Sequence, residues 1–396
     1  MAETILVRVG GMDRPGITAG LMEVLAAEGV ELYDVEQVVV RGRLTLGLLI
    51  GVPEGRSTIK SLLFHAWEAG FDIDFEVVED APPERGVDTV VTVIGPGVGP
   101  AAFGAVAAAI ATAGGNIERI SRLSRYPVVS YEIGVRGGDS GRIRTDLLAV
   151  AADHGVDVAV QPEGLARRAK RLVVLDVDST LVQDEVIDLL AEEAGVEDEV
   201  KAVTARAMAG EIDFAEALEA RVRRLAGLDE LTLERVRRRI RLTPGARTFI
   251  RTLQRMGMKT AIVSGGFDVF VDRIAEELGV DRAVANTLEM EDGRLTGRIV
   301  GPVVDRARKA AILKEIAAAE GIPLEQVVAV GDGANDVEML AVAGLGVAFN
   351  AKPAVRDVAD TSVSVPYLDA ILFLLGIRRA DVDETEPVPV EGLPPV

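Results

Sequence analysis

The first 163 residues repeat one pattern of hydrophobic and polar positions, with a period of about 85 residues. In each copy a strand-like run, 4–9 or 88–94, ends in a glycine-rich turn, and a helical pattern follows the turn. Two further strand-like runs, a second helical pattern and a closing strand complete the copy. The order βαββαβ predicts a ferredoxin-like domain, with a four-stranded antiparallel sheet and two helices on one face. We therefore place two such domains at residues 1–82 and 85–163.

A different pattern begins after a polar and basic linker at residues 164–170. Residues 171–175 form a continuous apolar run, which is typical of a parallel strand buried on both faces. Similar runs alternate with helical patterns further along the chain, at 259–263, 326–330, 346–349 and 361–365. Residues 171–378 are thus predicted to form a doubly wound, Rossmann-like α/β domain.

Three segments depart from this alternation. The insertion 183–242 has helical periodicity and no convincing strand, and it is long enough to cover the carboxyl ends of the sheet as a helical cap. Asp292-Gly293 separates two strand-like runs and predicts a β-hairpin. Acidic residues and prolines dominate residues 379–396, a composition that predicts a disordered tail.

The composition is that of a globular protein, with 48% apolar and 27% charged residues. A formal net charge of −20 opposes binding to nucleic acid by bulk electrostatics. No stretch approaches the roughly 18 apolar residues of a membrane span, and the first residues lack the basic region of a signal peptide. We therefore expect a cytoplasmic protein that binds neither nucleic acid nor membrane.

Missing residue types narrow the chemistry further. The chain has no Cys, which excludes disulfides, thiolate metal sites and cysteine nucleophiles. Its two histidines, His65 and His154, are too few for a histidine-based metal cage. Carboxylates, hydroxyls, Lys and Arg must therefore carry any chemistry.

Four local patterns in the α/β domain follow predicted strands or begin a helix, where open α/β sheets bind ligands. The first pairs Asp176 with Asp178, so that one carboxylate can attack while the other handles protons. The second places Ser264 before Gly265, where a hydroxyl and backbone amides can donate to phosphate oxygens. Each pattern taken alone also fits an ordinary turn.

The third pattern is Lys309 at the start of a helical run, where a cation is unfavourable unless an anion lies nearby. The fourth is a glycine-rich turn whose oxygen ligands suit Mg²⁺, from Asp332, Asn335 and Asp336. A solvated lysine and a plain turn are the alternatives for these two patterns alone. Four such patterns in order, each at a strand end or a helix start, are much harder to explain as ordinary turns and surface residues.

These motifs, within residues 171–376, resemble those of the haloacid dehalogenase-like phosphatases and, more narrowly, of the phosphoserine phosphatases. The resemblance implies that Asp176 is a nucleophile that forms an aspartyl-phosphate and that Asp178 is the acid/base. It also implies a Mg²⁺ ion held by Asp176, the Asp178 carbonyl and Asp332, with Asp336 organising the surrounding shell. By the same resemblance, the phosphoryl oxygens would be held by Ser264, Gly265 and Lys309.

The predicted cap resembles the same family at Met208 and Phe214, with Arg221 one helical face further on. Glu185 can pair with an α-ammonium group, and Arg221 can bind an α-carboxylate with two hydrogen bonds. Met208 and Phe214 would enclose a short side chain, and Asn335 is expected to contact the substrate. Without the motifs each cap residue would be a surface charge or a core residue. The resemblance implies hydrolysis of O-phospho-L-serine to L-serine and phosphate, the last step of serine biosynthesis.

The two N-terminal domains resemble ACT domains, which are small regulatory modules that bind amino acids. A turn containing Asp13 and Gly16 carries the resemblance in the first copy, and the repeat carries it in the second. The resemblance implies a homodimer that pairs through the ACT sheets, with feedback by L-serine near Asp13 and Gly16. A module that serves only to dimerise is the alternative.

Two other functions remain open from the sequence. The same site could pass the phosphoryl group to another hydroxyl acceptor, such as homoserine, in place of water. The chain could also be an amino-acid sensor with a vestigial phosphatase domain, although the complete set of motif carboxylates, hydroxyl and lysine argues against lost catalysis.

Overall fold

A computed structural model describes residues 3–53, 57–78 and 86–382, except for the side chain of Met208. The chain divides into two compact units, Met1–Arg85 and Gly86–Val396. Within the described residues, every helix is too short or too polar to span a membrane.

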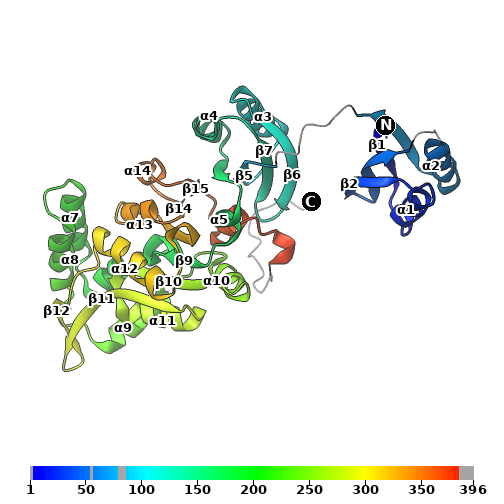
Figure 1. Cartoon of the computed structure of the whole chain (residues 1–396). Helices are drawn as coiled ribbons and strands as arrows, with labels where there is room; N and C mark the ends of the chain where they lie inside the picture. The colour runs from blue at the N-terminus through cyan, green and yellow to red at the C-terminus, as the bar shows by residue number, and fades with distance from the viewer. Residues whose placement is uncertain (1–2, 54–56, 79–85, 383–396) are drawn as a thin grey trace. The chain divides into compact units, whose positions relative to one another are not determined.

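The first unit is one ferredoxin-like domain (Figure 1). Its elements in chain order are β1 (Glu3–Met12), α1 (Ile17–Ala27), β2 (Glu31–Val40), β3 (Arg43–Val52), α2 (Ser57–Ala69) and β4 (Asp72–Val77). The sheet order is β2-β3-β1-β4, and all of its pairs are antiparallel. Alternate residues of β1, such as Val7, pack with Leu21 of α1 and Leu62 of α2. The predicted βαββαβ fold is confirmed.

The second unit opens with the same fold (Figure 1). Its elements are β5 (Thr89–Gly95), α3 (Pro100–Thr112), β6 (Asn116–Ser124), β7 (Val129–Arg136), α4 (Ser140–His154) and β8 (Asp157–Pro162). The sheet order is β6-β7-β5-β8, the equivalent of the order in the first unit. One face of this sheet packs on α3 and α4 through residues such as Val91 and Val93.

A seven-stranded sheet follows, in the order β12-β11-β10-β9-β13-β14-β15. The strands are β9 (Leu172–Leu175), β10 (Lys259–Phe267), β11 (Arg282–Glu291), β12 (Arg294–Val300), β13 (Val327–Gly331), β14 (Leu345–Phe349) and β15 (Thr361–Val363). All neighbours are parallel except β11 and β12, which form the predicted hairpin at Asp292-Gly293. The continuous apolar run of β9 is completely buried, as predicted.

Helices cover both faces of this sheet, which confirms the predicted doubly wound fold. They are α10 (Ala246–Arg255), α11 (Asp268–Leu278), α12 (Arg306–Ala319) and α13 (Val337–Val342). Residues of α10 and α11 share one core with Val173 and Leu175 of β9. Residues of α12 and α13 share the other core with Leu172 and Val174, because successive strand residues point to opposite faces.

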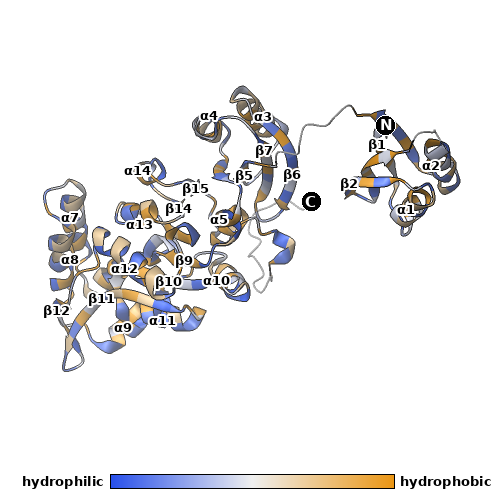
Figure 2. Cartoon of the chain, viewed as in Figure 1, coloured by the Kyte–Doolittle hydropathy of each residue, from blue (hydrophilic) through white to orange (hydrophobic). Residues whose placement is uncertain are grey.

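The segment expected to form a cap starts after Val182 and ends before Leu242. These two residues lie side by side in space, where an isolated antiparallel bridge joins them. It contains α6 (Val186–Ala194), α7 (Glu197–Met208), α8 (Phe214–Arg223) and α9 (Glu230–Arg239). Polar and apolar residues mix along α7 and α8 (Figure 2). The basic run of α9 is neutralised locally, since Arg235 and Arg239 both pair with Glu193.

The second ferredoxin-like domain packs against the seven-stranded sheet. β15 lies beside β8, where Ser364 N donates to Asp157 Oδ2 at 2.6 Å and Gln161 Nε2 donates to Leu374 O at 2.9 Å. Ile94 and Ala159 belong to the same apolar core as the large sheet. The open face of this smaller sheet is therefore an internal interface of the second unit.

The structure adds detail to two predicted segments. The linker contains a short helix, α5 (Leu165–Arg168), in which Arg167 is buried and pairs with Glu132 of β7. The disordered tail was predicted to start at residue 379. In the structure, Arg379–Asp381 form a helical turn and Val382 packs in the core. The remainder of that tail, residues 383–396, lies outside the described residues.

Candidate active site

Asp176 stands at the carboxyl end of β9, the central strand of the large sheet. It is only 3% exposed, and its backbone N donates to Val330 O of β13 at 2.9 Å. The chain then turns through residues 177–181, where Ser179 adopts a left-handed φ of 55°. This turn presents Asp176 and Asp178 at the edge where parallel strands place their ligands.

Lys309 reaches the same point from the first turn of α12. The helix begins after Asp305, whose side chain accepts from Arg308 N. Lys309 is completely buried, and its Nζ donates to Asp176 Oδ1 at 2.6 Å and to Asp336 Oδ1 at 2.7 Å. Burial alone would lower the pKa of Lys309, but the two carboxylates outweigh it and raise that pKa. Lys309 is therefore a fixed cation within the site.

Asp176, Asp332 and Asp336 form an acidic cluster, with one ligand atom from each within 4.8 Å of the others. Burial, followed by the charges of Asp336 and Glu185, raises the pKa of Asp332 to about 7. Such crowding of carboxylates favours a bound cation, and their oxygens suit a hard divalent metal. The cluster brings Asp176 of the first sequence pattern together with Asp332 and Asp336 of the fourth.

The side chain of Asp178 is hydrogen-bonded to the cap and to Ser264, outside the acidic cluster. Its Oδ1 accepts from Val186 N of the cap at 2.9 Å, and its Oδ2 accepts from Ser264 Oγ at 3.2 Å. Withdrawal from water raises the pKa of Asp178, although these hydrogen bonds oppose the shift. The two carboxylates of the first motif thus have different surroundings and can take different roles.

The loop after Val263 leaves room for these groups because Gly265 and Gly266 have no side chain. A Cβ added to Gly266 would lie 2.8 Å from Asp178 Oδ2 and 3.0 Å from Ser264 Oγ. A Cβ added to Gly265 would lie 3.2 Å from Cζ of Phe214, the first residue of α8. The glycines therefore let Asp178 and the cap approach the loop closely.

Glu185 and Arg221 bring the cap's charges toward the site. Glu185 Oε1 accepts from Ser179 Oγ at 2.8 Å, and burial followed by the charge of Asp178 raises the pKa of Glu185. Arg221 Nε donates to Ala217 O at 3.4 Å, and no described carboxylate lies within ion-pair distance of its guanidinium. Arg221 is mostly withdrawn from water, and burial lowers its pKa against the charge of Glu185. Arg221 is thus available to an anionic partner.

The other predicted residues are placed as follows. Asn335 is partly buried over Gly333, next to the acidic cluster. Met208 ends α7, and its side chain lies outside the described part of the chain. Asp13 and Gly16 belong to the first unit, where they lie in an exposed turn and Gly16 has a φ of 98° that favours glycine.

Three polar residues that the sequence did not single out also support the site. Thr180 Oγ1 donates to Asp332 Oδ1 at 3.4 Å, and Thr243 Oγ1 donates to Thr180 O at 2.7 Å. Asn286 links the Ser264 loop to the segment before α12. The sequence offers no clear signal for Asn286, which lies in a strand of mixed polar and apolar residues, whereas Thr180 lies inside the first motif.

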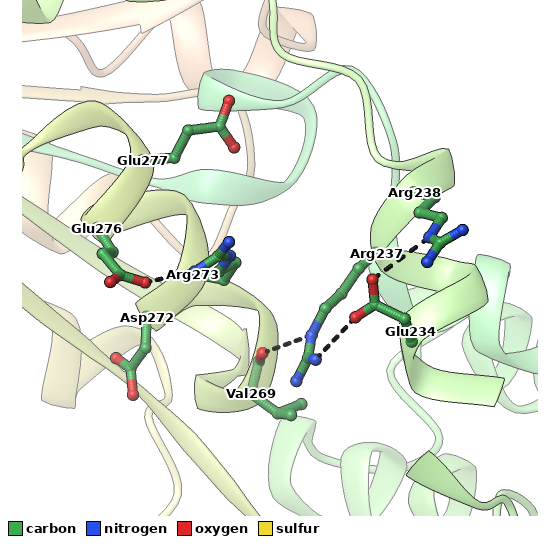
Figure 3. A pocket seen from close by; sticks show the side chains of 8 residues that line it. All are labelled: Glu234, Arg237, Arg238, Val269, Asp272, Arg273, Glu276 and Glu277. Carbon is green, nitrogen blue, oxygen red and sulfur yellow. Dashed lines mark hydrogen bonds and ion pairs between the residues drawn. The ribbon is translucent and has the colours of Figure 1, made fainter. Parts of the chain in front are cut away.

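A pocket between α9 and α11 lies apart from these residues (Figure 3). Its three arginines, Arg237, Arg238 and Arg273, already have partners. Arg237 donates to Val269 O and Glu234, and Arg273 donates to Glu276. None of the residues that line this pocket belongs to the candidate active site.

Comparison with protein families agrees with this division of the chain. Residues 173–341 match the haloacid dehalogenase-like hydrolase family, and residues 3–76 and 88–161 each match ACT domains. The chain is 52% identical to the phosphoserine phosphatase of Streptomyces coelicolor, over 97% of this chain and 94% of that protein. The chain belongs to the phosphoserine phosphatase family. Within the family it is also 49% identical to phosphoserine phosphatase SerB2 of Mycobacterium tuberculosis, over 97% of this chain and 95% of that protein.

Solved structures show the same relationship. A haloacid dehalogenase family hydrolase of Salmonella enterica serovar Typhi matches with a TM-score of 0.65 and 29% identity, over 72% of this chain and 98% of that chain. A probable phosphoserine phosphatase of Vibrio cholerae matches with a TM-score of 0.59 and 35% identity, over 74% of this chain and 88% of that chain. Both matches extend beyond the large sheet and its cap.

Proposed function

We propose that this chain hydrolyses O-phospho-L-serine to L-serine and phosphate, the last step of serine biosynthesis, through an aspartyl-phosphate on Asp176. The observation that carries the proposal is the buried Asp176 carboxylate at 2.6 Å from Lys309 Nζ. A carboxylate held beside a fixed cation can approach a phosphate dianion that would otherwise repel it. The curated relatives that match nearly the whole chain are named for this activity.

The proposed reaction has two steps, and Asp178 handles the proton in both. First, an Asp176 carboxylate oxygen bonds to phosphorus while the bond from phosphorus to the serine oxygen breaks, and that oxygen takes the proton of Asp178. Next, Asp178 removes a proton from water, the water oxygen bonds to phosphorus, and the bond to Asp176 breaks. The raised pKa of Asp178 favours the protonated acid that the first step needs.

Mg²⁺ is the proposed cation of the acidic cluster. Asp176 and Asp332 would hold it together with the backbone carbonyl of Asp178, while Asp336 orients Lys309 and accepts from Gly333 N. A site with few carboxylates and room for water suits this ion. When bound, Mg²⁺ supplies positive charge that offsets the charge of the phosphoryl group and the nucleophile.

The cap is proposed to select phosphoserine. Arg221 is mostly withdrawn from water and makes no direct ion pair with a carboxylate among the described residues, so the substrate α-carboxylate can take that place. Glu185 lies near both Asp178 and Arg221 and is proposed to pair with the α-ammonium group. Phe214, packed over Gly265, would limit the size of the substrate side chain.

The first ACT domain is proposed to form a homodimer through its edge strand β2. Every residue of β2 is exposed, including Leu32, Val35 and Val38. An edge strand with unpaired backbone groups and apolar side chains is suited to pair with another strand. The partner proposed here is β2 of a second copy, and Val38→Lys should shift the protein to monomer in light scattering.

L-serine is proposed to act as an effector at the turn with Asp13 and Gly16. Calorimetry should compare L-serine binding to the full chain with binding to a chain that starts at Gly86, where the second unit begins. A start near Arg168 is unsuitable because it would uncover the core around Ile94 and Ala159. If both chains bind serine identically, the first ACT domain has no effector role.

Phosphate release from a panel of phosphomonoesters, with and without Mg²⁺, tests the proposed activity. We expect O-phospho-L-serine to be preferred and turnover to stop when EDTA removes the metal. Adding homoserine tests the alternative reaction, because formation of phosphohomoserine would identify a phosphotransferase. Absence of phosphate release from every ester would instead favour a vestigial phosphatase domain.

A further inference from the structure

Asn286 is a buried amide in the middle of the strand β11. It lies in β11, follows Ala283-Val284-Ala285, and is 1% exposed. β10 and β11 pair in register up to Val263 and resume at Phe267, which lies opposite Asn286. The intervening residues of β10 form the Ser264 loop, so Asn286 stands where that loop returns to the sheet.

Both ends of the Asn286 amide are hydrogen-bonded to backbone atoms. Its Nδ2 donates to Gly265 O at 2.8 Å, and its Oδ1 accepts from Val304 N at 2.7 Å. Val304 directly precedes Asp305, the residue that begins α12, and Lys309 N donates to Asp305 O. One side chain therefore connects the loop that carries Ser264 to the helix that carries Lys309.

The bond to Gly265 O also sets the direction of the next backbone amide. In a planar trans peptide the C=O and the following N–H point in opposite directions. Because Asn286 holds Gly265 O on the sheet side, Gly266 N faces the site, where it donates to Ser264 Oγ at 2.8 Å. Ser264 Oγ in turn donates to Asp178 Oδ2 at 3.2 Å.

We infer that Asn286 is a positioning residue for phosphate binding, which fixes the Ser264 loop and the start of α12 at one separation. The inference rests on the proposed function, because it takes Ser264 and Lys309 as the groups that hold the phosphoryl oxygens. Asn286 touches neither of these side chains and acts through the Gly265–Gly266 peptide and the backbone of Val304. A small displacement of such donors weakens binding of the charge that develops in the transition state.

The test is Asn286→Leu in the full chain, which keeps a similar volume and removes both hydrogen bonds. Thr260→Val is the matched control, since Thr260 is completely buried in the adjacent β10 and bonds Asp281, away from the Ser264 loop. Four quantities are measured: the melting temperature, kcat and KM for phosphoserine, and the dissociation constant of inorganic phosphate by calorimetry with Mg²⁺. Phosphate binding requires no turnover, so its result is separate from the proposed activity.

We expect Asn286→Leu to weaken phosphate binding and to lower kcat by about tenfold to a hundredfold, which is about 1.4 to 2.7 kcal/mol in the barrier. Thr260→Val should lower the melting temperature by a similar amount and leave kcat and phosphate binding within about twofold. If Asn286→Leu does not fold, Asn286→Ser is measured, because its shorter side chain cannot reach both Gly265 O and Val304 N. A folded Asn286 variant with phosphate binding and kcat no weaker than those of Thr260→Val would overturn the inference.

Discussion

At the scale of single residues, the site combines buried charges that compensate one another. Lys309 lies between Asp176 and Asp336, whereas Arg221 has no such carboxylate among the described residues. A paired cation orders the site before substrate arrives, and an unpaired one is free to bind the substrate. The two cations are therefore expected to affect different kinetic parameters.

The role of Arg221 can be tested with two substrates. Arg221→Ala should reduce kcat/KM for O-phospho-L-serine about 100-fold more than for O-phosphoethanolamine, which lacks the carboxylate, or about 2.7 kcal/mol more. Arg224→Ala is the control, because Arg224 follows α8 and its Nε donates to Glu199 on the cap surface. Equal losses on both substrates would show that Arg221 supports the cap and does not recognise the carboxylate.

At the scale of elements, the loop after Val263 can lie close to Asp178 and to the cap because two of its residues, Gly265 and Gly266, have no side chain. Gly266→Ala would place a Cβ against Asp178 Oδ2 and Ser264 Oγ, so we expect kcat to fall at least about tenfold. Gly104→Ala is the control, because no atom lies within 4 Å of the added Cβ and alanine favours the α3 helix. Unchanged kcat in Gly266→Ala would contradict the close approach of Asp178 to this loop.

The elements were predictable where the hydrophobic pattern was strong. The apolar run of β9 and the Asp292-Gly293 turn each have a local physical cause, namely two-sided burial and a left-handed turn. The positions of Asp176 and Ser264 followed because the carboxyl ends of parallel strands meet at one edge. The bonds of Asn286 could not be predicted, because they depend on which backbone atoms two distant segments bring to its side chain.

The buried contact of the linker was unpredictable for a similar reason. Residues 164–170 are polar and basic. Arg167 is nevertheless buried, because Glu132 lies opposite it on β7. The sequence showed the charge but not its partner 35 residues away.

At the scale of the whole molecule, the two ACT domains differ in their relation to the phosphatase domain. The second shares a core and buried hydrogen bonds with the large sheet, whereas the first is a compact unit of its own. The second domain is therefore expected to contribute to the stability of the catalytic domain.

The pH dependence of stability at Asp157 can test this interface, because Asp157 accepts a hydrogen bond from Ser364 N. Burial raises its pKa, although hydrogen bonds from Ser364 oppose the shift. The folded state then holds a proton more tightly than the unfolded state, so the stability from this group is lost as pH rises through the raised pKa. Because Asp157→Asn cannot ionise, its melting temperature relative to wild type should rise as the pH increases above the ordinary Asp pKa of about 4.

Asp281→Asn is the control of opposite sign. Burial opposes the shift, but hydrogen bonds from Thr260 and Lys259 lower the pKa of Asp281. Wild type therefore gains stability from this group as the pH rises toward the ordinary Asp pKa of about 4. Over that lower pH range the melting temperature of Asp281→Asn relative to wild type should fall. The same trend in both variants would contradict a buried Asp157 at the interface.

The central claim is that Asp176 receives the phosphoryl group of phosphoserine. The most direct measurement is rapid acid quenching of the full chain during turnover of O-phospho-L-serine with Mg²⁺, followed by peptide mass spectrometry. The phosphoryl group should be found on the peptide that contains Asp176, and Asp176→Asn should trap none and lose at least about 99% of turnover. A phosphoryl group on another residue, or an Asp176→Asn variant that keeps turning over substrate, would contradict the account.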